Sequence, residues 1–380
     1  MIDSIVEDAV ALRRHLHKHP EISCEEKETS GLLKQKIETE CNPDQLIVFD
    51  HFGLAAIYEG ETEGKTIMIR GDFDALPIQE INDFEHKSIY DGVSHKCGHD
   101  GHASILYALA RRFATNRPER GKVILLFQPA EENGEGAKGI INDPKFDFKP
   151  DYVVALHNLP GYEKHTIVWK KGTFTAAANS LIIKLFGKTS HAAEPELGVN
   201  PALAMSEITR KILAFNVEDL NDPEFRIATP IYTTMGEKSY GVSAGYGELH
   251  FTLRAWDNEV IQGFEERCEA LAHKVGKAHG LNVKTSWTQS FFANCNDHDI
   301  IDAVKKVAGD LDLKSEERKS PFKWGEDFGI FTEKFPGAMF GIGSGVDCPA
   351  LHNPDYDFPD EILETAVNVF HGITRALQGE

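Results

Sequence analysis

One short segment of the 380-residue chain concentrates side chains that can bind a metal ion. It reads His95-Lys96-Cys97-Gly98-His99-Asp100-Gly101-His102, with a thiol and an imidazole on either side of a glycine. A thiolate and an imidazole at this spacing can point at one cation, and with added carboxylates they suit zinc, nickel, cobalt or manganese. Alone, a Cys-X-His pair is a weak signal, because histidine-rich loops also arise by chance.

Two adjacent carboxylates, Glu131 and Glu132, form a second feature. They follow the apolar run 123–127, which is expected to be a buried strand, and functional side chains of α/β proteins lie just past such strands. One carboxylate can bind a metal ion while its neighbour takes a proton from a bound water. Taken alone, such a pair is more typical of solvated surface charge.

Four further residues have an ordinary interpretation beside a functional one. His157 closes the apolar run 152–156, where a satisfied core histidine is common, and His352 fits a plain loop. Asp72 and Asp74 follow the strand-like run 66–69. They could hydrogen-bond to a metal-binding residue and orient it, or they could be ordinary acidic residues of a turn.

The placement of these weak signals is more informative than any one of them. Cys97, Glu132 and His157 each fall at or just beyond the expected end of a core element. Strands 66–69, 123–127 and 152–156 alternate with helical patterns, which predicts an α/β core with helices on both faces of a mixed sheet. In such a core these ends meet at one edge of the sheet.

The middle third of the chain has a different order of elements, namely strand, helix, two strands, helix and strand. The expected segments are 181–186, 201–215, 225–233, 248–254, 260–275 and 281–287. This order is typical of a self-contained ferredoxin-like unit. We therefore predict a discontinuous catalytic domain, 1–176 and 289–380, and an inserted domain, 177–288.

Composition limits the classes of partner. The net charge of −20 argues against nucleic acid, and no apolar run is long enough to cross a membrane. The N-terminal residues lack the basic and apolar pattern of a signal peptide, and the six cysteines show no repeating spacing. A cytoplasmic protein without disulfide bonds is expected.

The ordered set of motifs resembles the amidohydrolases that include hippurate hydrolase, N-acyl-amino-acid deacylases and auxin-conjugate hydrolases, within the two-metal aminoacylase and carboxypeptidase superfamily. The resemblance covers nearly the whole chain. It is carried by RRHLHKHPE (13–21), RGDFDALP (70–77), CGHDGH (97–102), QPAEE (128–132), His157, GKTSHAAEP (187–195), EDF (326–328) and LHNP (351–354).

This resemblance implies a role for each candidate residue. Cys97 would bridge two divalent ions, and His99, Glu132, His157 and His352 would supply the further ligands. Zinc is the expected metal, ahead of manganese, nickel or cobalt. Glu131 would be the general base toward a metal-bound hydroxide, and Asp74 would steady a ligand. The inserted domain would serve as lid and homodimer interface, and its His191 would polarise the carbonyl of an N-acyl amino acid.

The chain departs from the family pattern in the expected lid. Family members carry Asn-Val-Ile-Pro before the strand that leads to a lid arginine, whereas this chain has Gly241-Val242-Ser243-Ala244 and then Gly245-Tyr246-Gly247. Arg254 is retained where family members have an arginine near the substrate carboxylate or the lid core. Gly71 replaces a usual alanine. The Gly71 difference is minor, whereas the altered stretch 241–247 bears on substrate recognition more than on the hydrolytic chemistry.

Three alternatives remain open. Dipeptide or carboxypeptidase-type cleavage is the nearest one within the same superfamily. A cysteine hydrolase with Cys97 as nucleophile would leave Glu131 and Glu132 without a role. A binding relative that lost catalysis would be expected to have lost ligands, and all the proposed ones are present.

Overall fold

The computed structural model describes residues 2–379, which divide into two compact units. The large unit comprises Met1–Phe174, Asn294–Lys319 and Asp327–Glu380. The small unit comprises Thr175–Ala293 and Ser320–Glu326.

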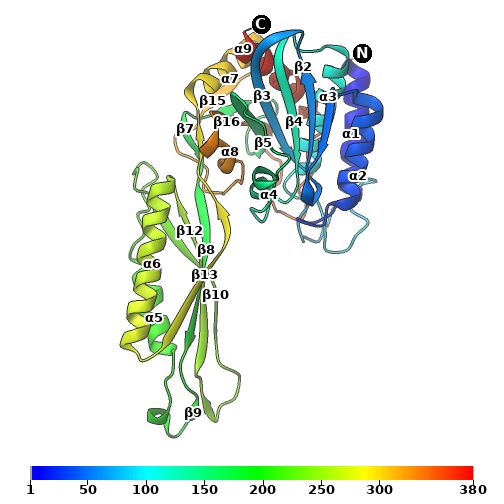
Figure 1. The fold of residues 1–380 in the computed structure, drawn as a ribbon. Coiled ribbons are helices and arrows are strands. Elements are labelled where there is room, and N and C mark those ends of the chain that lie inside the picture. The colour runs from blue at the N-terminus through cyan, green and yellow to red at the C-terminus, as the bar shows by residue number, and fades with distance from the viewer. Residues whose placement is uncertain (1, 380) are drawn as a thin grey trace. The chain divides into compact units, whose positions relative to one another are not determined.

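A mixed eight-stranded sheet in the order β1-β2-β4-β3-β5-β16-β6-β15 forms the frame of the large unit (Figure 1). Its strands are β1 (Gln45–Val48), β2 (Leu54–Glu59), β3 (Thr62–Asp72), β4 (Arg120–Gln128), β5 (Tyr152–Pro160), β6 (Ile167–Trp169), β15 (Ser315–Glu317) and β16 (Gly337–Gly345). The central strands β4, β3, β5 and β16 are parallel, whereas β1, β2 and β6 pair antiparallel with their inner neighbours. The chain therefore leaves β3, β4, β5 and β16 at the same edge of the sheet.

Helices cover both faces of this sheet, as the sequence predicts. Ile67 and Val154 share one core with residues of α1, α3, α7 and α9. On the opposite face, α8 packs close to β16. A Cβ atom on Gly337 would lie 2.4 Å from Val153 and 2.9 Å from Thr332, which belongs to α8. The helices and turns of this unit are α1 (Ile2–Lys18), α2 (Lys27–Lys36), η1 (Ile37–Cys41), η2 (Asp50–Phe52), α3 (His99–Thr115), α4 (Gly136–Asn142), α7 (His298–Asp310), α8 (Gly329–Lys334) and α9 (Ile362–Gln378).

The apolar patterns locate most of these elements correctly. Ile5, Ala9, Leu12 and Leu16 form the buried stripe of α1. Two strand ends were predicted too early, because polar residues continue the backbone pairing: β3 runs to Asp72, and β5 continues past His157 to Pro160. The histidine therefore lies inside the strand instead of closing it.

The small unit contains a four-stranded antiparallel sheet in the order β10-β12-β8-β13. Its elements, in chain order, are β8 (Ala177–Phe186), β9 (Ser190–His191), η3 (Pro195–Leu197), α5 (Ala202–Leu213), β10 (Arg226–Met235), β11 (Val242–Ser243), β12 (Tyr246–Ala255), α6 (Asn258–Ala278) and β13 (Asn282–Phe291). Ile183 of β8 and Phe251 of β12 share one core with Ile208 of α5 and Phe264 of α6. Both helices thus cover one face of the sheet.

Two short strands, β7 (Gly172–Thr175) and β14 (Asn294–Asn296), form a separate pair.

Within residues 2–379, each helix is too short or too polar to span a bilayer.

Candidate active site

Five side chains with metal-binding atoms gather at the carboxyl edge of the large sheet. Cys97 and His99 stand at the start of α3, and Glu132 lies in the turn after β4. His157 projects from β5, and His352 lies in the loop after β16. The structure thus brings together all five residues that the sequence marks as potential ligands.

Their potential ligand atoms form overlapping groups. Cys97 Sγ lies 3.6 Å from His157 Nε2, and Glu132 Oε1 lies 3.4 Å from His352 Nε2 and 3.9 Å from His99 Nε2. The atoms of Cys97, His99 and His157 lie within 4.8 Å of one another, and so do those of Cys97, Glu132 and His352. The thiol belongs to both groups.

Two atoms of the cluster lack well-directed hydrogen bonds. His99 Nε2 and Glu132 Oε1 are buried, and within residues 2–379 neither makes a well-directed hydrogen bond, although each lies near another potential ligand. A buried polar atom without a partner costs about 1–3 kcal/mol, and a bound cation removes that cost. A donor set of thiol, imidazoles and carboxylate fits a divalent ion such as zinc.

Glycine at position 98 allows Cys97 and His99 to flank one point. Gly98 has φ +92°, in the left-handed region, and a Cβ atom there would lie 2.6 Å from Asn158 Oδ1. Both the backbone conformation and the close approach therefore favour glycine between the two potential ligands.

Asp74 forms hydrogen bonds to two of the potential ligands, on the side away from the cluster. Its Oδ1 accepts a hydrogen bond from His99 Nδ1 at 3.0 Å, and its Oδ2 accepts one from the Glu132 backbone N–H at 3.0 Å. Burial pushes the pKa of Asp74 up, but the bond from His99 outweighs it, so the pKa falls below its ordinary value. The ionised carboxylate leaves His99 Nε2 facing the cluster.

The protonation states of the cluster follow from burial and neighbouring charge. Burial and the nearby His102 hold the pKa of His157 well below its usual range, and neutral imidazole is the form that binds a metal. His157 Nδ1 donates to the Asn158 carbonyl at 2.9 Å, which leaves Nε2 directed to Cys97. Burial raises the pKa of the Cys97 thiol, and a coordinated cation would reverse that shift.

Glu131 lies beside Glu132 in the same turn and is buried. Its Oε1 accepts a hydrogen bond from the Asp327 backbone N–H at 3.3 Å. A carboxylate oxygen of Glu131 also lies within 4.8 Å of ligand atoms of His99 and Glu132, so it stands where a proton acceptor is needed.

The remaining two candidates, His191 and Arg254, belong to the small unit. His191 is exposed on β9 and pairs with Val242 of β11. Arg254 lies on β12, where its Nη1 donates to the Lys323 carbonyl at 2.7 Å.

The unusual stretch 241–247 supports the hairpin of His191. The Gly241 carbonyl accepts a hydrogen bond from Ala192 N–H, and a Cβ atom on Gly245 would lie 2.4 Å from Thr189 N. A Cβ atom on Gly241 would meet nothing within 4 Å, so packing does not require glycine there.

Sequence reasoning gave no role to three buried polar residues beneath the cluster, Arg70, Asp327 and Glu26. Arg70 pairs with Asp72 at 2.5 Å and with Asp327 at 2.7 Å. Glu26 accepts from the Ala130 backbone N–H at 2.7 Å. Membership in a motif was the only available signal for Arg70 and Asp327, and Glu26 had none.

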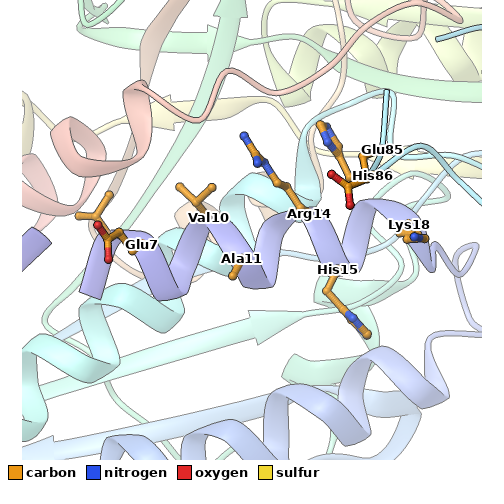
Figure 2. Close-up of a pocket in the computed structure, with 9 residues that line it drawn as sticks. Glu7, Val10, Ala11, Arg14, His15, Lys18, Glu85 and His86 are labelled. Carbon is orange, nitrogen blue, oxygen red and sulfur yellow. The ribbon is translucent and has the colours of Figure 1, made fainter. Parts of the chain in front are cut away.

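A hollow along α1 is distinct from this cluster. It is lined by residues such as Val10, Arg14 and His86, and by none of the potential ligands (Figure 2).

An α/β sheet with thiol, imidazole and paired carboxylates at its carboxyl edge defines a metal-dependent hydrolase. Residues 68–376 match peptidase family M20/M25/M40, and the chain belongs to this family. The predicted family resemblance and the prediction of an amidohydrolase are thereby confirmed.

Individual relatives agree with this assignment. Over 370 residues the chain is 31% identical to the N-acetyl-L-cysteine deacetylase of Bacillus subtilis, covering 96% of this chain and 86% of the relative. It is 29% identical over 365 residues to the hippurate hydrolase of Campylobacter jejuni, covering 94% of each. A Bacillus subtilis structure described as a dinuclear metal-binding peptidase of family M20 superposes with a TM-score of 0.83, at 25% identity and 99% coverage of both chains.

Proposed function

We propose that the protein hydrolyses the amide bond of N-acyl amino acids with two divalent cations held by Cys97, His99, Glu132, His157 and His352. The observation that carries this proposal is the position of the Cys97 thiol in two separate groups of potential ligands. A thiolate shared in this way can bridge two ions. The dinuclear description of the Bacillus subtilis structure supports the same stoichiometry. Zinc is the first candidate, followed by manganese, nickel and cobalt.

In this proposal, individual side chains have separate roles in the hydrolysis. Bound cations would supply the charge that polarises the amide carbonyl and acidifies a water molecule. Glu131 accepts the proton of that water and delivers it to the nitrogen of the leaving amine. Asp74 keeps His99 in orientation, and His191 of the small unit donates a hydrogen bond to the oxyanion.

The relatives and the retained residues of the small unit support the proposed class of substrate. The two relatives described above act, by name, on N-acetyl-L-cysteine and on hippurate. Arg254 supplies a cation suited to the carboxylate of the amino-acid half. The altered stretch 241–247 lies next to His191 and is therefore where the acyl preference of this chain would differ from that of its relatives.

A turnover screen tests reaction, substrate and metal together. N-acetyl and N-benzoyl amino acids and unblocked dipeptides are assayed with zinc, manganese, nickel or cobalt after chelation. We expect hydrolysis of the N-acyl compounds, loss of turnover in chelator and recovery with one of the metals. Full turnover by metal-free protein would contradict the proposal, and selective cleavage of dipeptides would move the assignment to a peptidase.

A pair of variants tests the general base. Glu131→Gln should lower kcat by about 100-fold or more, since it removes the proton acceptor while keeping shape. Glu135→Gln is the matched control, because Glu135 is an exposed carboxylate of the same turn whose side chain pairs with Lys138. Equal turnover in both variants would remove Glu131 from the mechanism.

The small unit supports a proposal of homodimerisation. Its edge strand β10 exposes the apolar side chains Ile231, Tyr232 and Met235, and an open edge of this kind is suited to pairing with a second chain. Light scattering of the purified protein should give twice the mass of one chain. The Ile231→Lys variant should give the mass of a single chain, because a charge on the edge strand disfavours pairing.

A further inference from the structure

The turn that carries Glu131 and Glu132 is held at both ends by buried carboxylates from distant parts of the chain. At its start, Glu26 accepts from the Ala130 N–H at 2.7 Å. At its end, Asp327 Oδ2 accepts from the Ala137 N–H at 2.8 Å. Ala130 has φ +52°, an unfavourable conformation for alanine, so the turn depends on such outside contacts.

Asp327 makes the larger number of these contacts. Its side chain is fully buried, and both oxygens accept from Gln128 Nε2 at 2.9 Å. Oδ1 also accepts from Arg70 Nη2 at 2.7 Å. Since Gln128 precedes the turn and Ala137 follows it, one carboxylate fixes the separation of the two ends.

The backbone of the same residue contacts Glu131 directly. The Asp327 N–H donates to Glu131 Oε1 at 3.3 Å, whereas Glu132 is held through its own N–H by Asp74. A glutamate side chain has several rotatable bonds, and the neighbouring acidic groups repel it. A fixed donor on one oxygen selects one orientation of the carboxylate.

Arg70 connects this arrangement to the histidine side of the cluster. Its guanidinium lies between Asp327 and Asp72, and Asp72 in turn accepts a hydrogen bond from His102 Nδ1 at 2.5 Å. All four side chains are buried. A buried arginine retains its charge and needs acidic partners, so Asp327 cannot leave its position without disturbing the arginine.

We infer that Asp327 is the positioning residue of the general base: its carboxylate fixes the turn 129–137 and its backbone N–H orients the Glu131 carboxylate. This inference rests on the proposed function of Glu131. Asp327 touches neither substrate nor cation in this role and acts only through the residue that does.

The test compares Asp327→Asn with Asn296→Ala in the full-length, metal-loaded enzyme. Asn296 is a matched control because it is buried and also bonds backbone groups, those of Lys170 and Met339, away from the turn. For Asp327→Asn we expect kcat to fall by about 10- to 100-fold, with KM and bound metal within about twofold of the parent. Asn296→Ala should lower Tm and leave kcat unchanged.

Hydrogen exchange supplies a readout that is independent of activity. Peptides that cover residues 129–137 should exchange faster in Asp327→Asn, because the acceptor of the Ala137 N–H is weakened, and should be unchanged in Asn296→Ala. If Asp327→Asn does not fold, Gln128→Met decides, since it removes the bond to Asp327 and keeps the carboxylate. It should show the same signature with a fall in kcat of about 3- to 10-fold.

The outcomes separate this inference from the proposed function. If Glu131→Gln abolishes turnover while kcat and exchange of the turn are unchanged in Asp327→Asn, the inference is wrong and the function stands. If Glu131→Gln keeps its turnover, the proposed function itself fails. If Asp327→Asn loses bound metal in proportion to its loss of activity, Asp327 supports the ligands instead of the base, which also overturns the inference.

Discussion

Replacing Glu26 by glutamine should change the pH dependence of stability in a predictable direction. The Glu26 side chain is fully buried, and its Oε2 has no hydrogen-bond partner within the described part of the chain. Burial, together with the negative charge of Asp74, raises its pKa from 4.5 to about 8. The folded protein therefore keeps this proton at pH values where the unfolded chain releases it.

The size of the effect follows from the difference between these pKa values. A gap between 4.5 and about 8 corresponds to about 5 kcal/mol between the two protonation states, and relaxation of the surroundings lowers this to about 2–5 kcal/mol. Because the folded-state pKa is raised, the contribution of Glu26 to stability is complete below pH 4.5 and is lost as the pH rises through 8. Glutamine keeps the oxygen that accepts from Ala130 N–H and does not ionise.

The assay is urea unfolding of the chelator-treated protein at about pH 5, 7 and 9, with parent and variant compared at each pH. Glu26→Gln should be less stable than the parent at pH 5, because it buries an unpartnered amide N–H₂. Its stability relative to the parent should then rise by about 2–5 kcal/mol toward pH 9. Glu25→Gln, which changes an exposed neighbour, should give a flat difference. A flat difference for Glu26→Gln as well would refute the reasoning.

Other substitutions test the supports of the site. Gly98→Ala places a Cβ atom against Asn158 at φ +92°, so it should destabilise the protein by about 2 kcal/mol or more and weaken metal binding. Gly139→Ala is the control, because the space around Gly139 is open, and it should do neither. Equal Tm values for the two variants would contradict this prediction. Asp74→Asn should lower metal affinity by about 10- to 100-fold in a chelator competition, because His99 loses its charged partner, and unchanged affinity would count against that role. His17, whose pKa rises to about 9 between Asp100 and Glu80 despite burial, stabilises the fold fully below pH 6.5 and loses this contribution as the pH rises through 9. The destabilisation by His17→Gln should therefore shrink by about 3 kcal/mol between pH 6 and 10 in urea unfolding, and a constant value would show that His17 is neutral in the fold.

The position of the candidate site could be predicted from the sequence because parallel strands order their ends. Apolar runs located β3, β4 and β5, and each had a chemical group just past or near its end, such as Glu132 after β4. In the small unit, the Asn200-Pro201 pair located the start of α5, and hydrophobic periodicity located α6. These inferences need only the local pattern and the rule that parallel strands end together.

The support of the site could not be predicted in the same way. The bond from Asp327 N–H to Glu131 joins residues 196 positions apart, and Glu26 contacts Ala130 across 104 positions. No periodicity encodes such pairs, since they depend on how loops close after the sheet has formed. The early strand ends assigned to β3 and β5 have a related cause, because Asp72 and His157 are polar yet are paired in the sheet.

The buried charges beneath the cluster explain why the acidic residues divide into two groups. Arg70 forms ion pairs with Asp72 and Asp327, and in a separate group Arg13 and His17 pair with Asp100. Glu132 and Cys97, by contrast, face histidines of the cluster itself. Without cations the acids and the thiol would repel when ionised, whereas bound divalent ions would neutralise them. Metal binding and the stability of this edge of the sheet are therefore linked, because the protein supplies counter-charges for the acids that hold its structure and leaves the others to the ions.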